Sequence, residues 1–433
     1  MSKKKRIIVV LCFSITAGVL SFPAGAQTSS AAGQWVSAWS AAMHAPLPFP
    51  GLPPSPTFEN QTIRMVVRLT LGGERVRIRL SNAFGTTALV IGAAHIALVS
   101  QGVKIVPESD HVLTFGGRAS ASIPPGSPML SDPVDLKIAA FAEIAVSLYL
   151  PNKTSATTVH FWAQHETYIS GPGDFTGKAE ISNATAKTSW YYLADAEVWA
   201  ANQTGATVAF GDSITDGVGV KQGDYGDWPD LLARRLAGEG SPKVALLNEG
   251  IGGNRILHDG AGASALARFD RDVLSQPGVV NLIVLEGIND IGWPHMKPPS
   301  LPNSTTPKEP PFASEAVSAQ DIIAGLQQLI ERAHEHRIRV IGATLTPFEG
   351  ADYYSAEGEA MRQAVNQWVR TSGAFDAVFD FDAAVRDPDH PAQFRENYHS
   401  GDHLHPSETG YRAMADAVDL SALRSALVGR TNR

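Results

Sequence analysis

The stretch that decides the fold runs from Ala206 to Thr215 and reads Ala-Thr-Val-Ala-Phe-Gly-Asp-Ser-Ile-Thr. Its first part, Thr207 to Phe210, is short, apolar and rich in residues that favour strands. At Gly211 it gives way to small polar residues, which predict a change of chain direction. Ser213 therefore follows the carboxyl end of a predicted buried strand. Ligands bind at that edge of an open α/β sheet, because loops and helix N-termini present free backbone N–H groups there.

Ser213 is a candidate nucleophile for this reason. The ordinary alternative is a tight turn with a capping serine, since Gly-Asp-Ser is common turn chemistry. A serine hydroxyl is a poor nucleophile unless a base accepts its proton and a third group orients that base. The choice between the two interpretations depends on what the rest of the chain supplies.

The sequence after Gly205 predicts strands that alternate with helices. Compact apolar runs without alternation are typical of strands buried on both faces; they are Val244 to Leu247, Val279 to Leu285, Val340 to Leu345 and Val378 to Phe381. Helical spacing occurs at Asp227 to Ala237, Ala263 to Leu274, Ser318 to His336, Ala356 to Val369 and Ser407 to Leu423. This order predicts an α/β domain over residues 205–433, a doubly wound parallel sheet with helices on both faces.

Residues 34–201 instead predict an all-β domain, a sandwich or jelly roll, because short strand-like runs are separated by Gly and Pro. Two of these runs, Thr62 to Leu71 and Arg75 to Leu80, flank Gly72-Gly73-Glu74, which predicts a hairpin. A further predicted strand covers Thr158 to Ile169. One face of the predicted hairpin carries Arg64, Arg68, Arg75, Arg77 and Arg79. This arginine stripe predicts a solvated sheet face, with a carbohydrate-contacting face as the alternative.

Residues 1–26 predict a cleavable signal peptide, and so a secreted or periplasmic protein. Lys3 to Arg6 form a basic start, Ile7 to Phe22 an apolar core, and Ala24-Gly25-Ala26 a small-residue end with cleavage before Gln27. An uncleaved membrane anchor is the alternative, although the apolar run is short for a span. The only cysteine, Cys12, lies inside this segment. The mature chain must then be stable without disulfides.

Charge excludes some classes of partner. Loss of the four cations in the signal peptide takes the formal net charge from −8 to −12. An acidic chain with no basic run has little attraction for nucleic acid or for an anionic membrane. We therefore expect neither nucleic-acid binding nor a stable membrane anchor after cleavage.

A base for Ser213 is predicted near the end of the chain. Asp402 and His405 are three residues apart on a segment that leads into the last predicted helix. If this segment makes a turn, the carboxylate can reach His405 Nδ1 and leave Nε2 to face the serine. His403 is expected to point elsewhere.

The same segment also permits a metal site. His399, Asp402, His403 and His405 form a compact cluster with zinc-ligating side chains. A hydrolytic metal site usually needs further ligands from another part of the sheet, and His258, Asp290 and His295 have no recognisable metal spacing. We therefore expect neither a metal nor another cofactor.

Two further loops can supply N–H donors for a tetrahedral oxyanion. Gly287-Ile288-Asn289-Asp290 directly follows the predicted strand that ends at Leu285, which places the Asn289 amide at the same sheet edge as Ser213. The glycine-rich stretch 248–254 likewise follows the strand that ends at Leu247, and a glycine N–H there can approach a substrate closely. Four loops at one edge together favour a catalytic site over an ordinary turn.

These four stretches resemble the signature blocks of the SGNH (GDSL-type) esterase and lipase superfamily, in its order. The blocks are Gly211-Asp212-Ser213-Ile214-Thr215, the glycine block that ends at Gly253, Gly287-x-Asn289-Asp290 and Asp402-x-x-His405-Pro406. The resemblance covers roughly residues 206–423 and implies a flavodoxin-like sheet and a metal-free Ser-His-Asp triad. The β domain resembles the extra sandwich modules of some secreted members.

The resemblance also implies a role for each site residue. Ser213 is the nucleophile and donates its own N–H to the oxyanion hole, which Gly253 and Asn289 complete. His405 is the base and Asp402 its partner. Gly253 is preferred to the adjacent Gly252 because it is the third residue after Gly250. Asp212 and Asp290 are expected to fix the loops by hydrogen bonds.

We expect a secreted serine ester hydrolase that acts on short-chain acyl esters, in particular O-acetyl groups on carbohydrate, with a small molecule or a polysaccharide as the partner. A lipase or general carboxylesterase is one alternative. A carbohydrate-binding surface protein with a non-catalytic hydrolase scaffold is another. Four tryptophans are candidates for stacking on sugar rings, although most are expected in the core: Trp35, Trp39, Trp162 and Trp190. The Pro-rich segment 293–311 is either a loop over the cleft or a surface insertion.

Overall fold

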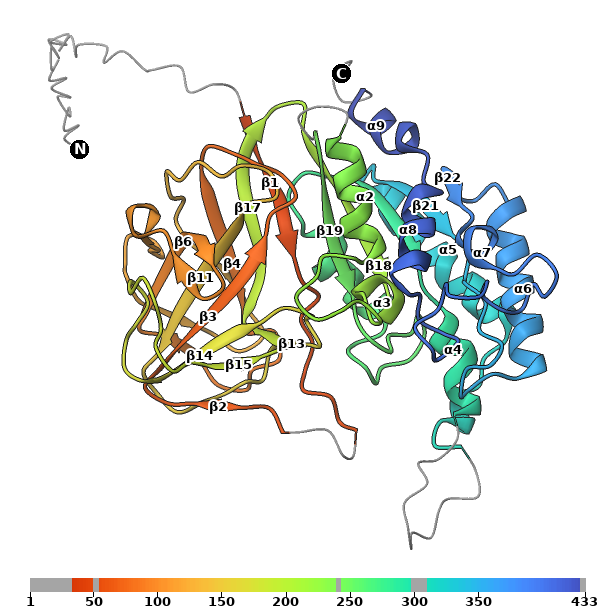
Figure 1. The fold of residues 1–433 in the computed structure, drawn as a ribbon, viewed down its shortest axis with the longest axis horizontal. Helices are drawn as coiled ribbons and strands as arrows, with labels where there is room; N and C mark the ends of the chain where they lie inside the picture. Colours follow the sequence, from red (N-terminus) through yellow and green to blue (C-terminus); the bar gives the residue numbers. More distant parts are fainter. Residues whose placement is uncertain (1–32, 50–53, 239–242, 297–309, 429–433) are drawn as a thin grey trace, which may run out of the picture. The chain divides into compact units, whose positions relative to one another are not determined.

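The structure, a computed structural model, describes residues 33–49, 54–238, 243–296 and 310–428 (Figure 1). The predicted signal peptide lies outside the described residues, as does most of the Pro-rich segment. Residues 33–433 form one compact unit. None of the helices in the described ranges is long and apolar enough to cross a membrane.

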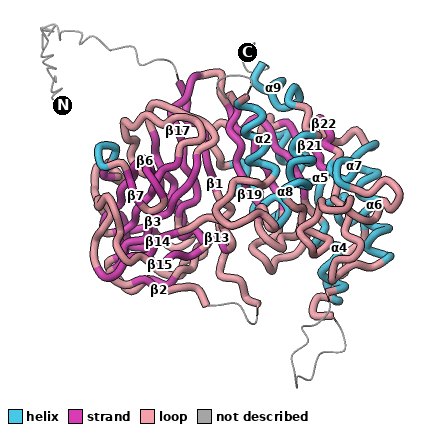
Figure 2. Tube along the Cα trace, viewed as in Figure 1, coloured by secondary structure: helices cyan, strands magenta, loops and turns pink. Residues whose placement is uncertain are grey.

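In the described part of residues 33–201 the regular elements are short strands joined by loops, with one 3₁₀ turn at Pro107–Ser109 (Figure 2). The strands are β1 (Gly33–Ser40), β2 (Thr57–Phe58), β3 (Gln61–Arg68), β4 (Val76–Ser81), β5 (Leu89–Ile91), β6 (Ala93–Gln101), β7 (Lys104–Ile105), β8 (His111–Val112), β9 (Ala121–Ile123), β10 (Pro128–Leu130), β11 (Glu143–Leu150), β12 (Thr154–Ser155), β13 (Val159–Phe161), β14 (Thr167–Pro172), β15 (Thr185–Lys187), β16 (Ser189–Tyr191) and β17 (Leu193–Ala201). We call this part the β half.

The β half contains two main antiparallel sheets. One has the order β1-β17-β4-β10, and the other has the order β15-β14-β3-β11-β6-β7 with β8 beside β6. Alternate residues of β3 and β4 are buried in one apolar core: Ile63, Met65, Val67, Val76, Ile78 and Leu80. The predicted all-β fold of this part is therefore confirmed.

The predicted hairpin is wrong. Strand β3 pairs with β11 and β14, whereas β4 pairs with β17 and β10, so the two strands belong to different sheets. Gly72-Gly73-Glu74 carries the chain from one sheet to the other, and Gly73 exchanges two hydrogen bonds with Ile138. Alternation of apolar residues fixes which face of a strand is buried, but it does not identify the neighbouring strand.

The arginine stripe is not a solvated face, so that prediction is wrong too. Arg64 is fully buried, and its guanidinium donates to Ser147 Oγ and to several backbone carbonyls. Arg77 and Arg79 each form an ion pair with the buried Glu197 of β17. Buried charges need such partners. Glu197 lies 118 residues after Arg79 in the sequence, so no local sequence pattern predicts this ion pair.

Residues 205–428 alternate strands with helices. The strands are β18 (Gly205–Gly211), β19 (Val244–Gly250), β20 (Val279–Leu285), β21 (Arg339–Ala343) and β22 (Ala377–Phe379). The α-helices are α1 (Ser213–Asp216), α2 (Trp228–Ala237), α3 (Ala265–Phe269), α4 (Ile288–Gly292), α5 (Ala319–Glu335), α6 (Ala356–Thr371), α7 (Phe381–Val385), α8 (Glu408–Asp416) and α9 (Leu420–Val428). A π-helical turn, Asp270–Leu274, continues α3, and 3₁₀ turns lie at Trp293–His295 and Ala313–Glu315. We call this part the α/β half.

The five strands of the α/β half form one parallel sheet in the order β19-β18-β20-β21-β22. Numbered along the chain this order is 2-1-3-4-5, the flavodoxin-like arrangement, and the predicted fold class is confirmed. Helices α2 and α8 pack together, and α5 packs on both α3 and α6. The single predicted helix from Ser407 to Leu423 is in fact the pair α8 and α9, separated at residues 417–419.

The register of the sheet makes β18, β19 and β20 end side by side. Gly211, at the end of β18, is paired with Gly250 on β19 and with Leu285 on β20. The loops that follow these three strands therefore leave the same edge side by side.

The β half covers the edge of the parallel sheet. Strand β1 packs against β19 and β18. Thr70 Oγ1 lies 3.0 Å from both the N and the O of Leu246, so one hydroxyl occupies both hydrogen-bonding groups of that edge residue. A single apolar core runs through both halves. The predicted domain boundaries, 34–201 and 205–433, stay a prediction, because the two halves pack as one unit.

Candidate active site

Ser213 lies where the sequence places it, at the first residue of α1. The helix begins there because Asp212 caps it, accepting a hydrogen bond from the Ile214 N–H at 2.9 Å. Gly211 is required just before, since a Cβ atom at this position would clash with Thr215 Oγ1 and with the Leu285 carbonyl. The side chain of Ser213 is thereby held at the carboxyl edge of the sheet.

His405 and Asp402 complete a chain of hydrogen bonds that starts at Ser213. His405 Nε2 lies 2.8 Å from Ser213 Oγ, and His405 Nδ1 lies 2.6 Å from Asp402 Oδ2. A carboxylate beside Nδ1 fixes the proton on that nitrogen, so Nε2 is left to accept the serine proton. The expected turn is present, because Asp402 Oδ1 accepts from the N–H groups of Leu404 and His405 at 3.0 and 2.9 Å.

Asp402 stays ionised in this arrangement. Partial burial raises its pKa, but hydrogen bonds from the His405 ring and from the backbone of His405 and Leu404 outweigh burial and hold the pKa well below 3.8. Asp402 therefore carries the negative charge that an imidazolium at His405 needs as a partner.

The other histidines of the alternative zinc site lie apart from this chain of hydrogen bonds. His403 stacks on His399 with ring centroids 4.2 Å apart. His399 Nδ1 accepts from the backbone N–H groups of Gly401 and His403. Both ring nitrogens of His405 are already engaged by Ser213 and Asp402. Within the described ranges, no group of three or more His, Cys, Asp or Glu side chains is arranged to hold a metal ion.

The loop after β19 presents Gly253 to the site. The Gly252 N–H donates to Asp216 Oδ2 at 3.0 Å, whereas the Gly253 N–H has no acceptor among the described residues. Gly253 has a φ of 79°, and a Cβ atom there would lie 2.9 Å from the Trp293 ring. The hydrogen bonding therefore supports Gly253 over Gly252 as an oxyanion donor.

Asn289 lies in the first turn of α4, directly after β20. Its Nδ2 donates to the Asn254 carbonyl at 3.0 Å, and its Oδ1 accepts from Tyr353 Oη at 3.2 Å. These two bonds fix the orientation of the amide and leave one N–H free to donate. The Ser213 N–H is also available, because the first residue of a helix has no intrahelical acceptor.

Asp290 holds together the two loops that carry Gly253 and Asn289. Its carboxylate accepts from the backbone N–H groups of Ile256 at 2.7 Å and Leu257 at 3.0 Å. Burial raises the pKa of Asp290 to about 6, although these hydrogen bonds oppose the shift. Burial also raises the pKa of Asp212 to about 7, and Asp212 Oδ2 is buried with no hydrogen-bond partner in the described part of the chain.

Sequence reasoning missed two residues beside the site, His160 and Asp216, and named a third, Trp162, only as one of four candidates for stacking on sugar rings. Asp216 accepts from Gly252 with one oxygen and faces His160 of the β half with the other, 3.0 Å from Nε2. Trp162 lies against Gly252, where a Cβ atom would be 3.3 Å from the indole. The predicted strand from Thr158 to Ile169 is wrong at this point, because β13 ends at Phe161 and Trp162 has a φ of 59°. No local sequence pattern predicts these contacts, because they join residues that are far apart in the chain.

Comparison with known proteins finds a family match within the α/β half. Residues 209–413 match the profile of the GDSL-like lipase/acylhydrolase family. No curated protein matches the chain.

Solved structures similar to the chain include three acylhydrolase-type proteins. A member of the lipolytic G-D-S-L family from Veillonella parvula is 20% identical, with a TM-score of 0.35, and the match covers 49% of this chain and 94% of that one. A mutant acetyl-xylooligosaccharide esterase from Geobacillus is 21% identical, with a TM-score of 0.37, and the match covers 49% of this chain and 91% of that one. A carbohydrate acetylesterase family member from Sinorhizobium meliloti is 14% identical, with a TM-score of 0.38, and the match covers 52% of this chain and 100% of that one.

Proposed function

We propose that this chain, a carboxylic ester hydrolase with a GDSL-like lipase/acylhydrolase domain over residues 209–413, works through an acyl-enzyme on Ser213. His405 Nε2 accepts the proton of Ser213 Oγ while the oxygen attacks the ester carbonyl carbon. The carbonyl oxygen becomes an oxyanion, which accepts hydrogen bonds from the N–H groups of Ser213 and Gly253 and from the Asn289 side chain.

The tetrahedral intermediate then collapses and the bond to the alcohol oxygen breaks. His405 returns its proton to this leaving oxygen, and the acyl group stays on Ser213. A water molecule attacks the acyl carbon while His405 accepts its proton. The second collapse releases the acid and restores the Ser213 hydroxyl. Asp402 holds the His405 tautomer throughout and stabilises the imidazolium.

The observation that carries this proposal is the unbroken chain Asp402–His405–Ser213. It joins two loops whose histidine and serine are 192 residues apart in sequence. The loops that carry Ser213, Gly253 and Asn289 follow β18, β19 and β20, which end at one edge of the sheet. A carbohydrate-binding protein that used this half only as a scaffold would have no need of the chain and the donors together.

We further propose short acyl groups, in particular O-acetyl groups on carbohydrate, as the substrate. Of the four candidate tryptophans, Trp39 and Trp190 are buried and Trp35 is partly buried against Trp199. Trp162 is 41% exposed and lies against the oxyanion loop, where an indole can stack on a sugar ring.

The exposed large hydrophobic side chains of the described residues are isolated: Val112, Leu130, Trp162 and Val378. They do not suggest a groove for a long acyl chain, which disfavours a lipase.

Secretion or a periplasmic location is part of the same proposal and rests on the sequence of residues 1–26. A soluble polysaccharide or small ester outside the cytoplasm is then the expected partner.

The test is hydrolysis of p-nitrophenyl acetate, p-nitrophenyl palmitate and acetylated xylan by the mature chain and by Ser213→Ala, with and without EDTA. We expect the substitution to lower kcat by at least about 10³-fold, EDTA to have no effect, and the activity to fall with acyl length. Trp162→Ala should lower kcat/KM on acetylated xylan by up to about tenfold and spare p-nitrophenyl acetate. Activity that survives Ser213→Ala and disappears with EDTA would overturn the proposal in favour of a metal site at His403 and His405.

A further inference from the structure

A buried pair of side chains joins the β half to the loops of the proposed site. His160 on β13 and Asp216 at the end of α1 lie 3.0 Å apart, and their side chains are 3% and 5% exposed. The pair is therefore shielded from water and from screening by salt.

Hydrogen-bond chemistry defines the charge of His160. Its Nδ1 lies 2.9 Å from the Ala42 carbonyl and its Nε2 lies 3.0 Å from Asp216 Oδ1. The carbonyl is an acceptor, and so is the oxygen of an ionised Asp216, whereas a neutral imidazole carries a proton on only one nitrogen. His160 satisfies both acceptors only as the imidazolium, with Asp216 as its carboxylate partner.

The neighbouring His44 shows the opposite pattern. Its Nδ1 lies 2.6 Å from the Ala45 carbonyl, but its Nε2 accepts from the Phe161 N–H at 3.0 Å. This ring is therefore neutral. Burial, followed by the charge of His160, lowers the pKa of His44 to about 3.

Three titratable or charged groups act on His160. Burial lowers its pKa and the positive charge of Arg268 does the same, but Asp216 and the hydrogen bond to Ala42 outweigh both, so the pKa is raised above 6.5. His44, whose ring centroid is 6.0 Å away, is neutral and opposes the imidazolium little.

Asp216, held by His160, also contacts the proposed oxyanion loop. Its second oxygen accepts from the Gly252 N–H, and the next N–H along the chain is that of Gly253. Asp216 also belongs to α1, the single helical turn that begins with Ser213. One carboxylate therefore links the nucleophile helix, the loop of the oxyanion donor and the imidazolium of the β half.

We propose that His160 is a positioning residue for ester hydrolysis: through Asp216 it holds the Gly252–Gly253 backbone so that the Gly253 N–H points at the oxyanion. This inference rests on the proposed function. If His160 has this role, the β half contributes to kcat. The activity then depends on His160 being protonated. Loss of that proton at alkaline pH leaves Asp216 without its cation and loosens the loop.

The experiment compares His160→Gln, Asp216→Asn and the double variant with His95→Gln. His95 is a matched control, because it also pairs with a carboxylate, Asp110 at 2.9 Å, but within the β half. We expect His160→Gln and Asp216→Asn to lower kcat on p-nitrophenyl acetate by about 10- to 100-fold with little change in KM. Binding of a boronic acid, which mimics the tetrahedral intermediate, should weaken by the same factor.

The pH profile and the double variant separate positioning from a purely structural role. The double variant should be no slower than the slower single variant, since both act through one contact. The alkaline fall of kcat in the wild type should be absent in His160→Gln. The control should keep the kcat, the inhibitor affinity and the pH profile of the wild type.

Two outcomes overturn the inference alone. One is a His160→Gln variant that keeps kcat at temperatures where it is folded. The other is ¹⁵N NMR of labelled histidine in the active wild type that shows a neutral His160 ring near pH 7. A folded wild type without esterase activity would instead overturn the proposed function, and with it this role.

Discussion

Asn289 is a proposed oxyanion donor, and two hydrogen bonds orient its amide, one to the Asn254 carbonyl and one from Tyr353 Oη. Removal of its amide by Asn289→Ala should lower kcat by about 10²- to 10³-fold, with KM nearly unchanged, because the donor acts on charge that develops in the transition state. Steady-state kinetics on p-nitrophenyl acetate measures this effect. Tyr353→Phe is the control, since it removes only the bond to Oδ1 and leaves Nδ2 held by Asn254. Equal losses in the two variants would contradict the assigned role.

Asp212 makes stability depend on pH. Its folded pKa of about 7 lies above its ordinary value of 3.8, so the unfolded chain releases this proton at lower pH than the folded one. Stability therefore falls as pH rises from about 4 to about 7, and the loss stays constant above that range. Asp212→Asn keeps the cap to Ile214 without a buried charge.

The Tm of Asp212→Asn relative to the wild type should therefore increase between pH 4 and pH 7.5, as measured by circular dichroism. A Tm difference that stays constant with pH would show that Asp212 does not bind the proton in the folded state.

The site could be predicted from sequence only where chemistry is carried by short local blocks. Ser213, Asp402, His405, Gly253 and Asn289 all belong to such blocks, and the structure brings their loops to one sheet edge. Their catalytic roles stay predictions. The pair His160–Asp216 could not be predicted, because it forms between two sheets and neither residue has a distinctive neighbour in sequence.

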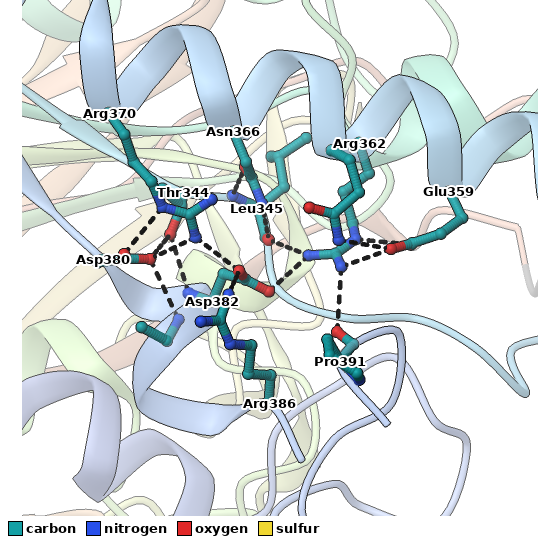
Figure 3. Close-up of polar contacts among 12 residues, drawn as sticks. Thr344, Leu345, Glu359, Arg362, Asn366, Arg370, Asp380, Asp382, Arg386 and Pro391 are labelled. Carbon is teal, nitrogen blue, oxygen red and sulfur yellow. Dashed lines mark hydrogen bonds and ion pairs between the residues drawn. The ribbon is translucent and has the colours of Figure 1, made fainter. Parts of the chain in front are cut away.

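At the scale of elements, a buried ion-pair cluster holds the segment that leads to His405. Asp382 of α7 pairs with Arg362 and Arg370 of α6 and with Arg386 (Figure 3). Arg362 also donates to the carbonyls of Leu345 and Pro391. The cluster therefore fixes α6, α7 and the start of the 386–405 segment relative to the sheet.

Arg362→Met should lower the free energy of unfolding by about 3–5 kcal/mol, because it removes a fully buried guanidinium that partners Asp382, Glu359 and two backbone carbonyls. Arg386→Met is the matched control, since Arg386 is more exposed and its loss should cost less than about 1 kcal/mol. Urea titration at 25 °C measures both. Similar costs for the two variants would contradict the view that the buried pair dominates the cluster.

Elements of the α/β half could be predicted because strands buried on both faces and amphipathic helices have distinct patterns. Strand pairing in the β half could not, as β3 and β4 show, because each strand pairs with partners far along the chain. The break between α8 and α9 was missed as well; Asp419 accepts from the Ser421 N–H at 2.9 Å there and so favours a new helix start.

At the scale of the molecule, the two halves share one core and one site. Sequence rhythm predicted the change from an all-β to an α/β architecture near residue 205. It could not predict that the arginine stripe divides between two sheets, or that Arg79 reaches the α/β half, where it donates to Gln276 Oε1 and to the Ser275 carbonyl. The β half is thus packed against the sheet edge and, through His160, against the catalytic loops.

The measurement that tests the acyl-enzyme mechanism most directly is labelling of the native protein by a fluorophosphonate ester, followed by peptide mass spectrometry. Only a serine activated by a base reacts readily with this reagent. We predict one label, on Ser213, with activity lost in proportion to labelling and no label in His405→Ala or in the unfolded chain. An active protein that stays unlabelled, or one labelled at another residue as its activity falls, would contradict the mechanism.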